Sequence, residues 1–241
     1  GRIGASDTTQ LQSDYSNTYH WGGREHKVIA GIDMYYEKAK RNNNFAGPAS
    51  TLTTTVDHPN NGDWRPDTRG EPTYNHFNAR NLGLYVQDMV SMTDTLKLVA
   101  GLRFDHFKAS YDTATTTAAN GTITPGYSFG KSESLWSPRV GLLFQPSETQ
   151  SYYVSFGTSY NTSGDAYQFT PSSPNQTLAK TPAEKSRNLE IGGKWELFDQ
   201  PLSVGPALFY SEKYNERNQD PDSAAQQFLL SGKRHAAGIE F

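Results

Sequence analysis

The chain contains no cysteine, so disulfide bonds and thiolate metal sites are excluded. It also lacks long apolar runs, and none of its segments approaches the roughly 18 uncharged apolar residues that a membrane-spanning helix needs. Lys and Arg are scattered and the formal net charge is -3, which predicts no nucleic-acid partner. Only 34% of the 241 residues are hydrophobic, and the mean hydropathy is -0.73. Aliphatic residues are therefore scarce for a chain of this size.

The chain has instead an alternation of residue types with a period of two. Leu82, Leu84 and Val86 alternate with less apolar residues, and the same pattern resumes between Leu96 and Phe104. A period of two places the apolar side chains on one face of a strand and mixed side chains on the other. Short turn-like segments separate such strands around Gly22, at 92–95, at 146–150 and at 199–201.

About nine antiparallel strands are predicted from this pattern, at residues 12–21, 27–38, 79–92, 96–112, 135–145, 151–161, 186–198, 202–218 and 229–241. Residues 1–11 are predicted to be the tail of a loop. Long polar loops are predicted at 42–78, 113–134 and 162–185. Short periplasmic turns and long extracellular loops are typical of an outer-membrane β-barrel. A barrel also explains the low aliphatic content, because only one face of each strand contacts lipid.

The strand count predicts that residues 1–241 are part of a larger transmembrane barrel. Single-chain bacterial barrels are closed and usually have an even number of strands. An open edge in lipid leaves backbone groups without partners. Pro206 removes a hydrogen-bond donor inside the predicted strand 202–218, so we expect a local bulge there. A half-buried soluble sheet has the same alternation, but such long strands with such unequal connections are unusual for it.

Six segments in serial order resemble the barrel strands of TonB-dependent siderophore receptors, most closely the catecholate-type branch. They are NLGLYVQD at 81–88, LVAGLRFD at 98–105, WSPRVGLLFQP at 136–146, YYVSFGTS at 152–159, TPAEKSRNLEIGGKW at 181–195 and LSVGPALFYSEKYNERN at 202–218. Pro206 departs from the pattern, where a small residue is expected. The resemblance implies a barrel of roughly 22 strands with a plugged lumen, whose plug and remaining strands are absent from this chain.

The resemblance also implies a function for the parent protein. It implies a receptor in the bacterial outer membrane, surrounded by lipid and lipopolysaccharide, that imports ferric siderophores by TonB-dependent active transport. The TonB complex would act through the absent N-terminal region. Iron would pass as a ferric siderophore, so neither a cofactor nor a protein-ligated metal is expected.

A ferric siderophore is bulky, often anionic and partly aromatic, so its pocket should offer Arg or Lys beside aromatic rings. The three predicted loops contain that mixture, and the candidate ligand-binding residues are Trp64, Arg65, Arg69, Tyr74, Phe77, Tyr127, Phe129 and Tyr167. The alternative is that these side chains hold the loops together or face lipopolysaccharide. Arg103 and Arg139 are predicted to face the lumen and to pair with carboxylates such as Asp105 or Glu190, or with the plug.

No catalytic residue is predicted. The chain has no G-x-S-x-G elbow, no H-E-x-x-H motif and no phosphate-binding glycine loop. One rival interpretation is a small complete outer-membrane barrel that acts as an adhesin or passive pore, which requires a native end after Phe241. A second rival is a membrane-embedded hydrolase, whose candidate residues are His58, His76, Asp57, Asp63 and Asp67.

Overall fold

The described part of the chain consists of β-strands joined by turns and short connections. The computed structural model describes residues 4–45, 55–58, 72–118, 121–161, 182–198, 202–219 and 228–241. Ten strands form one antiparallel sheet: β1 (Gly4–Trp21), β2 (Arg24–Phe45), β3 (Pro72–Ser91), β4 (Leu96–Asp112), β7 (Ser128–Ser147), β8 (Gln150–Asn161), β9 (Glu184–Leu197), β10 (Leu202–Val204), β11 (Ala207–Gln219) and β12 (Phe228–Glu240). Two short strands, β5 (Thr116–Thr117) and β6 (Ile123–Thr124), form a separate ribbon.

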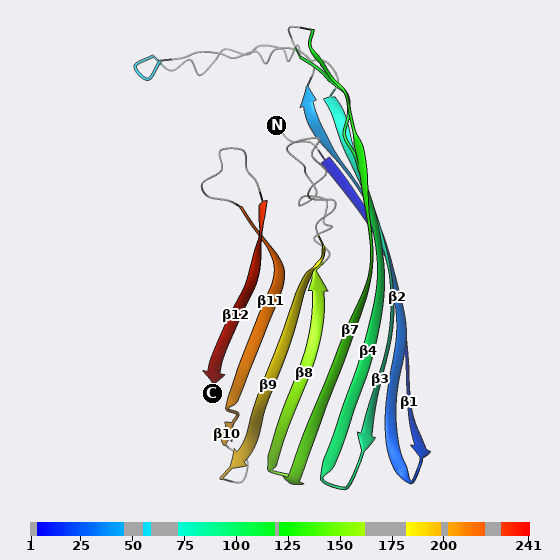
Figure 1. Ribbon diagram of the computed structural model, residues 1–241, viewed down its shortest axis with the longest axis vertical. Helices are drawn as coiled ribbons and strands as arrows, with labels where there is room; N and C mark the ends of the chain where they lie inside the picture. Colours follow the sequence, from blue (N-terminus) through cyan, green and yellow to red (C-terminus); the bar gives the residue numbers. More distant parts are fainter. Residues whose placement is uncertain are drawn as a thin grey trace.

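The strands of the large sheet lie side by side in chain order. The order is β1-β2-β3-β4-β7-β8-β9-β11-β12, and β10 pairs with β9. Figure 1 shows long strands with the short turns at the lower end of the view and the connection between β4 and β7 at the upper end. Strands β1 and β12 lie at the two ends of this order and do not pair with each other in the described residues. The predicted all-β antiparallel meander with unequal connections is therefore confirmed.

The turns at the lower end have the chemistry that tight hairpins require. Gly22 and Gly23 have φ of 59° and 74°, and positive φ at both central residues is characteristic of a type I′ hairpin turn. In the turn after β3, Thr93 Oγ1 accepts a hydrogen bond from the backbone N–H of Leu96 (3.0 Å). Strands β7 and β8 meet at Ser147 and Gln150. The turn predicted at 199–201 lies outside the described residues.

Several strands are longer than predicted at the loop end of the sheet. Residues predicted as a loop tail belong to β1, where Gly4 pairs with Arg41 and Leu11 with Met34. The predicted loops 42–78 and 113–134 are also partly wrong, because β3 begins at Pro72 and β7 at Ser128. These extensions are mostly polar, and their few large apolar side chains, among them Phe77 and Phe129, do not alternate along one face. They therefore lack the alternation that marks a strand with one face in lipid.

The local bulge predicted at Pro206 is not present, because the register against β9 is unshifted: Val204 pairs with Trp195 and Ala207 with Gly192. The predicted strand 202–218 is divided into β10 and β11, with Gly205 and Pro206 between them. The carbonyl of Pro206 accepts a hydrogen bond from the backbone N–H of Gly193 (3.0 Å). The chain thus stays attached to β9 at the one residue that has no N–H of its own to donate.

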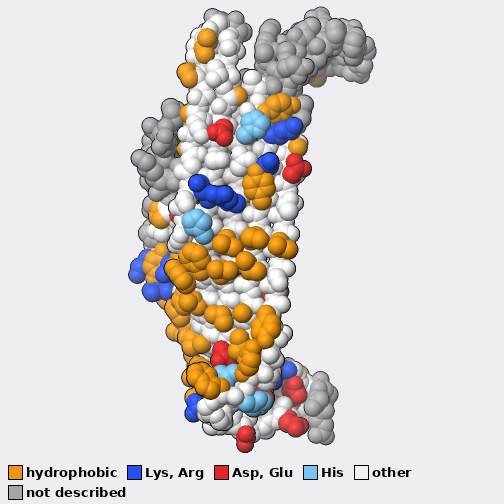
Figure 2. Space-filling view, turned by 90° about the vertical axis from the view of Figure 1, so that its right-hand side faces the viewer, with side chains coloured by type: hydrophobic (Ala, Val, Ile, Leu, Met, Phe, Trp, Pro, Cys, Tyr) orange, Lys and Arg blue, Asp and Glu red, His pale blue; other side chains and the backbone are white. Residues whose placement is uncertain are grey.

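One face of the sheet carries a band of exposed apolar side chains, and we call it the outer face. Its members are between 42% and 55% exposed and come from four strands, β3, β4, β7 and β9: Leu84, Val86, Leu102, Val140, Leu142, Leu189 and Ile191. Figure 2 shows this band across the sheet. Such a band facing away from the lumen is the lipid-contacting surface of a membrane barrel. No helix in the described segments is both long and apolar enough to cross a membrane.

Replacing a residue in the middle of the band tests its contact with lipid. Leu102 pairs with Val86, and Leu102→Arg is expected to destabilise the full-length protein by about 2–4 kcal/mol, the cost of Arg near the bilayer midplane. The measurement is unfolding by denaturant after refolding into lipid vesicles. Ser155→Arg is the control, because Ser155 pairs with Glu190 on the other face. Equal stability of the two variants would contradict a lipid-facing band.

Candidate functional site on the inner face

The face of the sheet opposite the apolar band, which we call the inner face, is polar. The antiparallel register places Gln12, Asp33, Gly83 and Asp105 in one row across β1 to β4. A cavity of about 800 Å³ lies against this face, and its lining includes Asp33, Tyr35, Tyr85, Arg103, Asp105, Ser137 and Arg139. These residues alternate with the lipid-facing ones along every strand, so the cavity is on the lumen side of the sheet.

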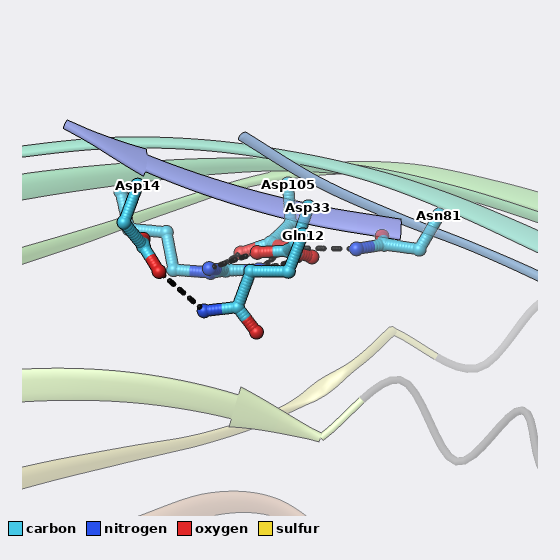
Figure 3. A network of polar contacts seen from close by, with 6 residues as sticks. Gln12, Asp14, Asp33, Asn81 and Asp105 are labelled. Carbon is cyan, nitrogen blue, oxygen red and sulfur yellow. Dashed lines mark hydrogen bonds and ion pairs between the residues drawn. The ribbon is translucent and has the colours of Figure 1, made fainter. Parts of the chain in front are cut away.

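A network of charged hydrogen bonds crosses the floor of this cavity (Figure 3). Arg103 donates to both carboxylate oxygens of Asp33 (2.6 and 3.2 Å) and to both of Asp105 (2.8 and 2.6 Å). Asn81 Nδ2 donates to Asp105 Oδ1 (3.0 Å). Bidentate pairing uses the planar fork of the guanidinium and fixes its orientation. The predicted pairing of Arg103 with Asp105 is confirmed, and Asp33 is a second partner that the sequence analysis did not identify.

Gly83 makes room for this network. It lies between Asp33 and Asp105 in the row, and the Arg103 guanidinium passes over it. A Cβ at position 83 would meet Arg103 Nη2 and would lie 2.7 Å from Asp33 Oδ2. A side chain at this position would therefore displace the guanidinium or a carboxylate. Glycine is required here because the Arg103 side chain comes so close to the backbone of residue 83. Its φ is not in the left-handed region, so backbone conformation is not the reason.

Arg139 lines the same cavity but has a different environment. Among the described residues it has no ion pair with a carboxylate. Glu190, one of the partners considered for it, instead accepts a hydrogen bond from the hydroxyl of Tyr153. Arg139 thus places a positive charge on the cavity wall, on β7 beside Gly157 of β8.

An aromatic cluster lies on the inner face nearer the loop end. Its buried members are Phe77, Phe107, Tyr111 and Phe129, with Ala79 and Ala109. The rings of Tyr111 and Phe129 are stacked with centroids 5.3 Å apart, and those of Tyr127 and Phe129 are 6.0 Å apart. Burial, followed by the proximity of Tyr111, raises the pKa of the Tyr127 phenol. The hydroxyl therefore stays protonated at neutral pH and can donate a hydrogen bond.

The structure brings together three of the eight predicted ligand-binding residues. Phe77, Tyr127 and Phe129 meet in or beside the aromatic cluster, although the side chains of Phe77 and Phe129 are only 2% and 8% exposed. Tyr74 lies an odd number of residues from Phe77 on β3, so it faces outward, with Lys40 Nζ 5.5 Å from its ring centroid. The other predicted residues, Trp64, Arg65, Arg69 and Tyr167, lie outside the described residues.

The histidines proposed for a hydrolase do not lie on the inner face cavity. His76 is on β3 at an outward-facing position, paired with Lys40 and Asp112. His58 and Asp57 belong to the short described segment 55–58, and Asp63 and Asp67 lie outside the described residues. Within the described segments, no three His, Asp or Glu side chains are grouped as a metal site would require.

Comparison with known proteins gives a match along nearly the whole chain. A family profile described as "TonB dependent receptor-like, beta-barrel" matches residues 2–241. The catecholate siderophore receptor Fiu of Escherichia coli K12 is 26% identical over an alignment of 251 residues, covering 95% of this chain and 32% of Fiu. The probable TonB-dependent siderophore receptor PiuA of Acinetobacter baumannii is 29% identical over 150 residues, covering 61% of this chain and 20% of PiuA.

Solved structures share the fold. The closed form of Fiu from E. coli K12 gives a TM-score of 0.74 at 20% sequence identity, covering 99% of this chain and 35% of that chain. PiuA from A. baumannii gives a TM-score of 0.74 at 22% identity, with the same coverage of both chains. The chain spans about a third of the length of Fiu.

Removing the shared cation tests the contribution of the network to stability. Arg103→Gln leaves Asp33 and Asp105, on either side of Gly83, without their common partner. We expect a loss of about 1–3 kcal/mol in the stability of the full-length protein. Lys97→Gln is the control, because Lys97 Nζ donates to an uncharged group, Gln145 Oε1 (3.1 Å). Adding Asp33→Asn and Asp105→Asn should restore part of the loss. The measurement is the denaturant concentration at the midpoint of unfolding. If Arg103→Gln were as stable as Lys97→Gln, the network would not be a stabilising feature.

Proposed function

This chain belongs to the TonB dependent receptor-like β-barrel family, and we propose on that basis that its parent protein imports ferric siderophores, with the catecholate class as the first candidate. The protein is located in the outer membrane of a Gram-negative bacterium, as the homologues are. The observation that carries the proposal is the match to the family over residues 2–241, together with a relative named as a catecholate siderophore receptor that aligns with 95% of the chain.

The chemistry of the inner face supports this cargo. A ferric catecholate complex combines negative charge with aromatic rings, so it suits a wall that offers a cation and aromatic side chains. Arg139 supplies a cation without a carboxylate partner in the described residues, and Tyr127 supplies a ring with a protonated hydroxyl beside the aromatic cluster. The cargo would first meet the loop end of the sheet, where these aromatic residues lie. Trp64, Arg65, Arg69 and Tyr167 remain proposed contacts on the neighbouring connections.

The parent protein is expected to need more than this chain. We assign residues 1–241 to part of the barrel domain, with a plug and further strands elsewhere in the parent. TonB would supply energy through a segment outside this chain. The inner face is then the wall on which the plug rests, and the outer face contacts lipid and lipopolysaccharide. Import, rather than catalysis, is the activity assigned, since the named family members are receptors.

The test is an uptake experiment in a strain that lacks its own siderophore receptors. The full-length parent is expressed, and transport of radiolabelled iron is measured with catecholate, hydroxamate and citrate-type carriers. Uptake with a catecholate that disappears when TonB is deleted is the expected result. Failure to restore uptake with any carrier would overturn the cargo assignment, and uptake independent of TonB would overturn the mechanism.

A variant of Tyr127 tests the proposed contact with the cargo. Tyr127→Ala is expected to weaken binding of a ferric catecholate about fivefold, because an aromatic pair contributes about 1 kcal/mol beyond the area it buries. Tyr127→Phe retains the ring and should bind nearly as the wild type does. Binding to the purified receptor is measured by titration calorimetry. If Tyr127→Ala bound as tightly as Tyr127→Phe, the ring would have no role in recognition.

A further inference from the structure

A group of cations lies on the outer face, next to the apolar band on its loop side. Going along β3 from the band, Leu84 and Leu82 are followed on the same face by Arg80. On β4, Phe104 and His106 are followed by Lys108. Arg80 pairs directly with Lys108 in the register, and with Tyr36 on the other side. Arg80 is thus the next outward-facing residue after Leu82 and lies about 7 Å further along the strand. Lys108 lies beside it on β4. Figure 2 shows Lys and Arg side chains directly above the apolar band.

This part of the outer face has the opposite charge balance to the whole chain. Beyond Leu82, on the described parts of strands β1 to β7, the outward positions carry four cations, Lys38, Lys40, Arg80 and Lys108, against two carboxylates, Asp7 and Asp112. The whole chain has a formal net charge of -3. These outward positions therefore carry a net charge of +2, four cations against two carboxylates, although the whole chain is negative.

Arg80 and Lys108 are the unusual members of this group. Lys38 Nζ lies 5.3 Å from the ring centroid of Tyr36, and Lys40 Nζ lies 5.5 Å from that of Tyr74. Arg80 and Lys108 have no ion pair with any described carboxylate, and both side chains are exposed. Like charges directly opposite each other on neighbouring strands destabilise a sheet. An anion held between the two side chains would remove that repulsion.

The surface between the two side chains is hollowed. A depression of about 210 Å³ lies there, lined by Arg80, Lys108, Tyr36, Asn78 and Ser110 together with Ala79 and Ala109. Asn78 and Ser110 pair with each other and are the next outward-facing residues after Arg80 and Lys108, going away from the band. The depression therefore combines two cations with neutral hydrogen-bonding side chains, which is the donor set that phosphate and sugar hydroxyl groups need.

We propose that this depression binds a phosphate group of a phosphorylated glycolipid in the outer leaflet, the lipid A part of lipopolysaccharide. The proposal deepens the lipopolysaccharide contact given under the proposed function and depends on it. The acyl chains would lie along the apolar band beside Leu82 and Phe104, while the guanidinium fork of Arg80 and the ammonium group of Lys108 hold the phosphate. The sugar hydroxyls would meet Asn78 and Ser110. A lipid headgroup fits better than free phosphate, because the site lies at the edge of the lipid-facing surface.

The experiment measures lipid binding by the full-length receptor purified in detergent and freed of native lipid. Native mass spectrometry is used with bisphosphorylated lipid A, with lipid A lacking phosphate, and with inorganic phosphate. Arg80→Gln combined with Lys108→Gln is expected to weaken retention of bisphosphorylated lipid A about tenfold or more, because two charged hydrogen-bond donors to phosphate are lost. The phosphate-free lipid should bind both proteins equally and weakly.

A matched variant controls for the change in net charge. Lys27→Gln combined with Lys97→Gln removes two cations from the inner face near the turns, and it should retain lipid A as the wild type does. The proposal would be overturned if both double variants lost the same amount of bound bisphosphorylated lipid A, or if neither lost any. If inorganic phosphate displaced lipid A when both were present at similar concentrations, the depression would be a site for free anions, and the proposed lipid site would be wrong.

The test of this site is separate from the test of import. Binding of lipid A is measured without a siderophore, so a wrong cargo assignment would leave its outcome unchanged. The heat-modifiable shift on electrophoresis verifies that each variant is folded. If the Arg80→Gln, Lys108→Gln protein were not recovered in folded form, Lys108→Gln alone would be measured, with a smaller loss of lipid A expected and unchanged retention again contradicting the proposal.

Discussion

The structure depends on one constraint, that backbone N–H and C=O groups inside a bilayer must find their partners within the protein. Antiparallel pairing in chain order satisfies this requirement from β1 to β12 without a long crossover between strands. The same pairing fixes which side chains share a face, because a slip of one residue would exchange the two faces. A single register therefore determines three features: the apolar band, the inner-face cavity and the cations on the outer face.

The two faces of the sheet differ in how they accommodate charge. On the inner face, charges occur at the depth of the apolar band, and Asp33, Arg103 and Asp105 satisfy one another through hydrogen bonds. On the outer face, the strands in the middle of the band carry aliphatic side chains, and Arg80 and Lys108 occur only beyond its edge. The β-strand accommodates both patterns because successive side chains point to opposite sides. Each strand thus combines two surfaces of different chemistry.

Sequence reasoning succeeded where a strand has one face in lipid. Strand β4 was predicted at 96–112 and begins and ends there, because apolar residues alternate along all of it, first on the outer face as far as Phe104 and then on the inner face from Phe107. It failed for residues 4–11 of β1, which are polar on both sides and so give no periodic signal. The pairing of Arg103 with Asp33 spans 70 positions, and only the register of three strands brings them together. Tyr74 and Phe77 were grouped by proximity in sequence, yet they fall on opposite faces of β3.

The close approach of Arg103 to the backbone at Gly83 links the evolutionary histories of the two positions. Any side chain at position 83 would collide with the guanidinium while Asp33 and Asp105 hold it in place. A larger residue there becomes acceptable only after position 103 has lost its long side chain, and that step first leaves two carboxylates without a cation. Both single-step routes thus pass through a less stable intermediate, so the pair is expected to be inherited together among descendants of this barrel.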